Sequence, residues 1–187
     1  MSIETLVVGS MATNCYIVDD IIVDPGDDAE YIISHITQKP SMIVATHGHF
    51  DHIMAAYALQ LTYNIPFYIH PDDIFLLATM QSSAKHFLGL KEVDPPPVPT
   101  PLQGLSFFHT PGHTPGSICL QFSDVLIVGD SIFADGGVGR TDFSYSKPLK
   151  LADSIDRILS YPPDTRLLPG HGKETTVKQE SLWKLQK

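Results

Sequence analysis

Three histidines and an aspartate stand within six consecutive residues of this chain: His47, His49, Asp51 and His52. Neutral imidazole and ionised carboxylate are the side chains that zinc, iron and manganese prefer as ligands. The group follows an apolar run at 41–45, so it lies beside the core, where polar side chains are unfavourable unless they are paired or bind something. His47 and His49 can converge on one ion from a turning loop, whereas Asp51 and His52 open the next helix and face a second ion. The spacing predicts a metal site.

Three further residues of these types each come after an apolar strand-like run and a glycine: His113, Asp130 and His171. We expect them to gather with the first four along one edge of a sandwich. A single histidine is more often a core or surface residue, but seven such groups at recurring strand ends are hard to explain without a metal. The other histidines are expected to have no ligand role: His35, His70, His86 and His109.

Short β-branched runs alternate with helix-like segments, which predicts a layered α/β sandwich within one domain, 1–187. Strands are expected over 3–8, 15–18, 21–24, 42–46, 66–69, 105–109, 118–122, 125–128 and 166–168. Helices are expected over 28–37, with Asp28 as the cap, and over 52–61, 71–80, 148–160 and 175–185. The proline-rich stretch 94–101 reads as a stiff extended connector between half-domains, and 81–92 as a flap.

The composition narrows the classes of function. Lys and Arg number 12 against 21 Asp and Glu, for a net charge of −9 in 187 residues, which disfavours nucleic acid as a partner. The N-terminus lacks the pattern of a signal peptide, and no apolar run approaches the ~18 residues of a membrane span. We therefore expect a cytoplasmic protein with no membrane partner and with Cys15 and Cys119 as buried, reduced thiols. The oligomeric state stays open.

Four motifs in this order resemble the metallo-β-lactamase superfamily: H-G-H-F-D-H at 47–52, T-P-G-H-T-P-G at 110–116, G-D at 129–130 and P-G-H-G at 169–172. The likeness is to the short glyoxalase II-like, or hydroxyacylglutathione hydrolase-like, branch and extends over nearly the whole chain. It implies a four-layer αββα sandwich and two divalent metal ions, with zinc as the first choice and iron or manganese as alternatives.

The resemblance also implies a role for each ligand. It assigns the first metal to His47, His49 and His113, the second to Asp51, His52 and His171, and a bridging position to Asp130. Asp24 would anchor the loop behind the site.

The implied reaction is attack of a metal-bridging hydroxide on the carbonyl of a thioester such as S-lactoylglutathione, with Asp51 and Asp130 as catalytic residues. A thiol pKa of ~8.5 makes the thiolate a good leaving group without a separate acid. G-V-G-R-T-D-F at 137–143 resembles a segment of the same branch in which a basic residue meets a glutathione carboxylate, so Arg140 is the predicted substrate-binding residue. The alternative is that Arg140 pairs with Asp142 or Asp135.

The sequence departs from full-length glyoxalase II, which carries a helical C-terminal domain, because 16 residues follow His171. Lys147 and Lys173 are alternative contacts for the substrate, or simply solvated cations. Rival functions are a persulfide dioxygenase with a single iron, a nuclease or phosphodiesterase, and a non-catalytic binding module. The acidic charge opposes the nuclease, and the complete ligand set opposes the binding module.

Overall fold

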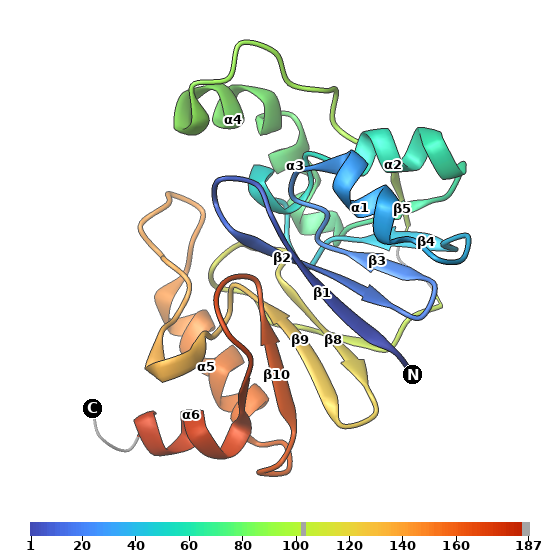
Figure 1. Ribbon diagram of the computed structural model, residues 1–187. Coiled ribbons are helices and arrows are strands. Elements are labelled where there is room, and N and C mark those ends of the chain that lie inside the picture. Colours follow the sequence, from blue (N-terminus) through green and yellow to red (C-terminus); the bar gives the residue numbers. More distant parts are fainter. Residues whose placement is uncertain (102–103, 185–187) are drawn as a thin grey trace. The chain divides into compact units, whose positions relative to one another are not determined.

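The computed structural model describes residues 1–101 and 104–184, in two compact units, Met1–Leu102 and Gln103–Lys187 (Figure 1). Each unit has its own sheet and its own buried apolar cluster. The boundary comes directly after the proline-rich connector predicted at 94–101. The prediction of one domain over 1–187 stays a prediction.

The first unit contains a six-stranded sheet in chain order: β1 (Ile3–Val8), β2 (Thr13–Val18), β3 (Ile21–Val23), β4 (Met42–Val44), β5 (Phe67–Tyr68) and β6 (Pro99–Thr100). β1 to β3 form an antiparallel meander, whereas β3 to β6 pair in parallel. The carboxyl ends of the parallel strands share an edge of the sheet, which brings the residues after β3 and β4 together. Pro99 is tolerated in β6 because this is an outermost strand of the sheet, and proline is confined to such strands.

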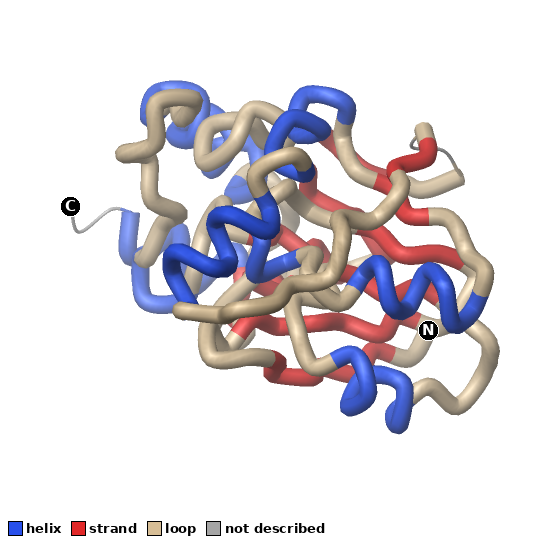
Figure 2. Tube along the Cα trace, turned by 90° about the horizontal axis from the view of Figure 1, so that it is seen from above, coloured by secondary structure: helices blue, strands red, loops and turns tan. Residues whose placement is uncertain are grey.

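Six helical segments belong to this unit: α1 (Ala29–His35), η1 (Phe50–His52), α2 (Ala56–Tyr63), η2 (Pro71–Asp73), α3 (Ile74–Leu77) and α4 (Met80–Leu88), η marking a 3-10 turn. α1 and α2 contact each other beside the first sheet (Figures 1 and 2). They bury Ile32 and Leu59 in the apolar cluster of this unit.

Three helix predictions in this unit need correction. Asp28 precedes α1 but does not cap it, because its backbone is left-handed (φ 53°) and its carboxylate instead accepts a hydrogen bond from Gly9 N at 2.8 Å. The helix expected over 52–61 begins only at Ala56, so Asp51 and His52 lie in the 3-10 turn η1 and not at a helix N-terminus. The stretch expected as a flap at 81–92 mostly continues α4.

The second unit contains a five-stranded sheet in the order β11-β10-β9-β8-β7. Its strands are β7 (Phe107–His109), β8 (Ile118–Phe122), β9 (Val125–Gly129), β10 (Arg166–Pro169) and β11 (Thr175–Thr176). β9 and β10 pair in parallel, while the other pairs are antiparallel. Because β9 and β10 end at the same edge, the residues that follow them, Asp130 and His171, come together.

Two α-helices and a 3-10 turn complete this unit: α5 (Pro148–Leu159), α6 (Val177–Lys184) and η3 (Ala134–Gly136). α5 was predicted nearly to the residue, because Pro148 suits the first helical position and the apolar side chains of Leu151 and Ile158 share its buried face. The helix expected over 175–185 starts two residues later, after β11, and Leu185 lies outside the described residues. Within residues 1–101 and 104–184, every helix is too short or too polar to cross a bilayer.

Candidate metal centre

A buried carboxylate, Asp24, organises the loop that holds the first predicted ligands. Asp24 follows β3 and is fully buried. Its Oδ1 accepts a hydrogen bond from Thr46 N at 2.6 Å, and its Oδ2 accepts bonds from Thr46 Oγ1 at 2.6 Å and from His52 Nδ1 at 3.0 Å. Asp24 therefore anchors this loop, in keeping with the role that the resemblance implied.

This network decides which nitrogen of two histidines carries the proton. A carboxylate can only accept, so His52 Nδ1 must be the protonated nitrogen. The hydroxyl proton of Thr46 points to Asp24, so Thr46 Oγ1 accepts from His47 Nδ1 at 3.2 Å. In both imidazoles Nδ1 therefore carries a proton, which leaves Nε2 as the nitrogen that can bind a metal.

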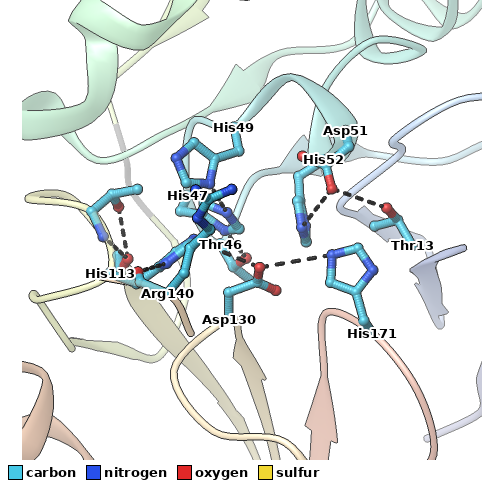
Figure 3. Close-up of polar contacts among 12 residues, drawn as sticks. Thr13, Thr46, His47, His49, Asp51, His52, His113, Asp130, Arg140 and His171 are labelled. Carbon is cyan, nitrogen blue, oxygen red and sulfur yellow. Dashed lines mark hydrogen bonds and ion pairs between the residues drawn. The ribbon is translucent and has the colours of Figure 1, made fainter. Parts of the chain in front are cut away.

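We call the four predicted ligands of this unit the first ligand group: His47, His49, Asp51 and His52 (Figure 3). His47 Nε2 lies 3.1 Å from His49 Nδ1. Two nitrogens bound tetrahedrally to one zinc at ~2.0–2.1 Å are ~3.3 Å apart, so this separation fits two ligands of one ion. Asp51 Oδ2 lies 3.7 Å from His52 Nε2 and accepts a hydrogen bond from Thr13 Oγ1 at 3.5 Å.

The three predicted ligands of the other unit also come together, and we call them the second ligand group: His113, Asp130 and His171 (Figure 3). Asp130 Oδ2 lies 3.6 Å from His113 Nε2 and 3.7 Å from His171 Nε2. These separations exceed a hydrogen bond, but two imidazole nitrogens around one carboxylate oxygen suit a shared cation.

The orientation of His113 is set by a backbone atom that the sequence did not indicate. His113 Nδ1 donates to the carbonyl oxygen of Arg140 at 2.8 Å, so Nε2 is again the lone-pair nitrogen, facing Asp130. The neighbouring Gly139 is packed so closely that a Cβ there would lie 1.9 Å from Asp130 O and 3.0 Å from His113 Nδ1. Both ligand groups therefore fit a divalent metal in donor type, and His47, His52 and His113 also fit it in tautomer.

Comparisons with known proteins identify the family. Residues 8–171 match the sequence profile of the metallo-beta-lactamase superfamily. The chain belongs to this superfamily. The predicted family and fold are confirmed, and so is the coarser part of the predicted activity, a hydrolase with a divalent-metal site.

Three relatives of this superfamily member are of particular interest. A "probable metallo-hydrolase", YqgX of Bacillus subtilis, is 36% identical over 92% of this chain and 91% of its own. The "hydroxyacylglutathione hydrolase GloC" of Haemophilus influenzae is 33% identical over 96% of this chain and 95% of its own. A crystal structure of TTHA1623 "in a di-iron-bound form" has a TM-score of 0.88 and 33% identity, and covers 95% of this chain and 96% of that one.

Glu180 in α6 accepts hydrogen bonds from the loop that leads to Gly139 and Arg140, a role that the sequence did not indicate. This carboxylate is 2% exposed, and it accepts hydrogen bonds from Gly136 N at 2.8 Å, Asp135 N at 3.3 Å and Thr175 Oγ1 at 2.5 Å. The sequence predicts only a helix here, because an acidic residue on a helix usually faces solvent.

Arg140 forms an ion pair with Asp142. The alternative to substrate binding by Arg140 was an ion pair with either Asp142 or Asp135. Arg140 Nε and Nη2 each donate to the Asp142 carboxylate at 2.6 Å, and the guanidinium lies 4.5 Å from the centre of the Phe143 ring. The hydrogen bonds from Arg140 lower the pKa of Asp142 to about 2. Both side chains are exposed. Substrate binding by Arg140 stays a prediction.

Lys173, His109 and His70 each contact a protein group of their own unit, and both thiols are buried. Lys173 forms an ion pair with Asp135 at 2.9 Å. His109 Nε2 contacts Pro115 O at 2.7 Å, and His70 Nδ1 accepts a hydrogen bond from Asp72 N. Cys15 and Cys119 are buried and unbridged, and burial raises the pKa of both thiols.

Proposed function

We propose that this chain hydrolyses small thioesters of the S-lactoylglutathione type with a pair of divalent metal ions, zinc in the first place and iron or manganese as alternatives. The proposed ligands are the first ligand group and the second ligand group, with Asp130 as the bridging residue. The observation that supports the proposal is the hydrogen bonding of Nδ1 in His47, His52 and His113, which leaves Nε2 of each imidazole available to bind a metal. The 33% identity to a hydroxyacylglutathione hydrolase supports the substrate class.

Bound divalent ions would lower the pKa of water from ~16 towards ~7 and polarise the carbonyl oxygen of the substrate. The Asp51 carboxylate, held by Thr13 at 3.5 Å, would accept a hydrogen bond from the attacking water and orient it. The thiolate leaving group needs no proton donor from the chain, because its conjugate acid has a pKa of ~8.5.

Arg140 is proposed to bind a carboxylate of the thiol part of the substrate. Its Nε and Nη2 already donate to Asp142, so a substrate carboxylate would either use Nη1 or displace Asp142. Because both residues are exposed, such an exchange requires no rearrangement of the core.

The runner-up is a persulfide dioxygenase with one iron. Its iron would be held by His113, Asp130 and one of the early histidines, two imidazoles and a carboxylate, which is the ligand type of non-haem iron oxygenases. The observation that favours it is the 3.6 Å separation of His113 Nε2 and Asp130 Oδ2. The remaining predicted ligands argue against it, since they would have no ligand role.

The experiment that tests the proposal combines metal analysis with a substrate panel. Purified protein loaded separately with zinc, iron and manganese is assayed on S-lactoylglutathione, on a thioester without glutathione, and on a β-lactam. We expect two ions per chain and hydrolysis of at least one thioester. Oxygen uptake with glutathione persulfide, together with one iron per chain and no thioester hydrolysis, would replace the proposal by the runner-up.

A further inference from the structure

Asp73 is a fully buried carboxylate outside both ligand groups. It ends η2 and occupies the N-cap position of α3, where an aspartate usually accepts a hydrogen bond from the first turn of the helix. Its side chain makes no such capping bond. Capping therefore does not explain an acid at this buried position.

The carboxylate instead contacts the backbone of the first ligand group. Asp73 Oδ2 accepts a hydrogen bond from Gly48 N at 2.9 Å, across 25 residues of sequence. Gly48 is the residue between His47 and His49, so this bond holds the backbone that connects the two imidazole-bearing residues.

The fit of Gly48 against this turn is close. A Cβ on Gly48 would lie 2.9 Å from Leu76 Cβ and 3.0 Å from Asp73 O. Gly48 therefore lies directly on the junction of η2 and α3, which accepts its hydrogen bond and leaves no space for a side chain at this position.

We propose that Asp73 is a positioning residue for metal binding: its hydrogen bond to Gly48 N holds the His47 and His49 nitrogens at the separation that one ion requires. The inference rests on the proposed ligand role of this pair. Without the bond, the backbone at Gly48 can rotate. Part of the free energy of metal binding is then spent on bringing His47 Nε2 and His49 Nδ1 back to their separation of 3.1 Å. A bond to a carboxylate suits this task, because charge-assisted hydrogen bonds are shorter and stronger than neutral ones.

Three variants test the inference by cobalt titration, followed through the visible absorption of the bound ion. Asp73→Ala removes the acceptor, and Asp73→Asn keeps an amide oxygen for Gly48 N without the charge. Asp72→Ala is the control, because it removes an acid of the same turn that is exposed and contacts His70 instead. Circular dichroism of the metal-free proteins establishes that each variant is folded.

We expect Asp73→Ala to bind cobalt about 10- to 100-fold more weakly, which is the usual effect of removing a partner that orients ligands. Asp73→Asn should restore the affinity to within about threefold and the wild-type spectrum, since an amide oxygen also accepts the bond. Asp72→Ala should match the wild type. Wild-type affinity in Asp73→Ala overturns the inference. An Asp73→Asn protein that is folded but has a changed spectrum or an affinity as low as that of Asp73→Ala overturns it as well.

The result is separable from the proposed activity, because cobalt binding is measured without substrate. A wild-type protein that binds cobalt but hydrolyses no thioester ends the thioesterase proposal and leaves the role of Asp73 standing.

Discussion

Replacing Thr46 by valine removes one hydroxyl from the network behind the first ligand group and leaves a methyl group of similar size. That hydroxyl donates to Asp24 Oδ2 at 2.6 Å and accepts from His47 Nδ1 at 3.2 Å. Asp24 and His47 are 0% and 1% exposed, so water cannot take the place of the hydroxyl. The backbone bond from Thr46 N to Asp24 Oδ1 is retained.

The loss of both hydrogen bonds should lower the stability of the Thr46→Val variant. A hydrogen bond to a buried charged group is worth about 1.5–3 kcal/mol, and leaving the His47 N–H unpaired adds about 1 kcal/mol more. The free energy of unfolding of the metal-free protein should fall by about 2–4 kcal/mol, which lowers Tm by about 5–15 °C in a chain of this size. Metal affinity should fall about 10- to 100-fold, because the tautomer of His47 is no longer enforced.

The assay is urea unfolding of the chelated protein together with metal competition against an indicator dye. Thr62→Val is the matched control, since it removes an equivalent hydroxyl that bonds to Ala58 O on the exposed side of α2. Thr46→Val behaving like Thr62→Val in both measurements would refute the reasoning. A less stable protein with unchanged metal affinity would refute the tautomer argument alone.

Two further substitutions address the second unit. Asp130→Ala should leave fewer than two ions per chain in elemental analysis and lower turnover about 100-fold or more. The reason is that Asp130 Oδ2 lies near both His113 and His171. Full metal content together with full activity would contradict the proposed bridging role of Asp130. Arg140→Ala should raise KM for S-lactoylglutathione more than it lowers kcat. An unchanged KM would contradict the proposal that Arg140 binds a carboxylate of the substrate. The same variant should return the pKa of Asp142 from about 2 towards its ordinary value of ~3.9, as followed by NMR. Since the pair depresses the folded-state pKa, its contribution to stability is present above the ordinary carboxyl pKa and is lost as pH falls through about 2.

The strands were predictable because burial determines them. β1 has the predicted bounds, and runs such as Ile43–Val44 and Val125–Val128 contain residues that cannot stay in water at low cost. Helix starts were less predictable, because they depend on contacts distant in sequence. The carboxylate of Asp28 could cap α1 but bonds to Gly9 across the unit.

The metal ligands were predictable for a different reason, since histidine and aspartate after a strand end are informative by type alone. Residues that act on a ligand through the backbone gave no such signal. Asp73 read as one polar residue of a helix expected over 71–80, and Glu180 as one of another. Each became recognisable only when its carboxylate was found buried against the N–H of a distant glycine, Gly48 or Gly136. A buried acid that caps no helix is the signal to search for in relatives of this chain.

Arg140 illustrates how one position can serve two purposes through different atoms. Its carbonyl oxygen fixes the tautomer of His113, which any residue type could do, whereas the packing against Asp130 requires glycine at position 139. The guanidinium, exposed and paired with the exposed Asp142, has little to contribute to stability, because ion pairs in water are weak. The His113 contact therefore does not depend on an arginine side chain here, and the proposed role of the guanidinium is to bind an anionic substrate. For this reason Arg140→Ala separates substrate binding from metal binding: the backbone bond to His113 survives the substitution, and metal content should stay unchanged while KM rises.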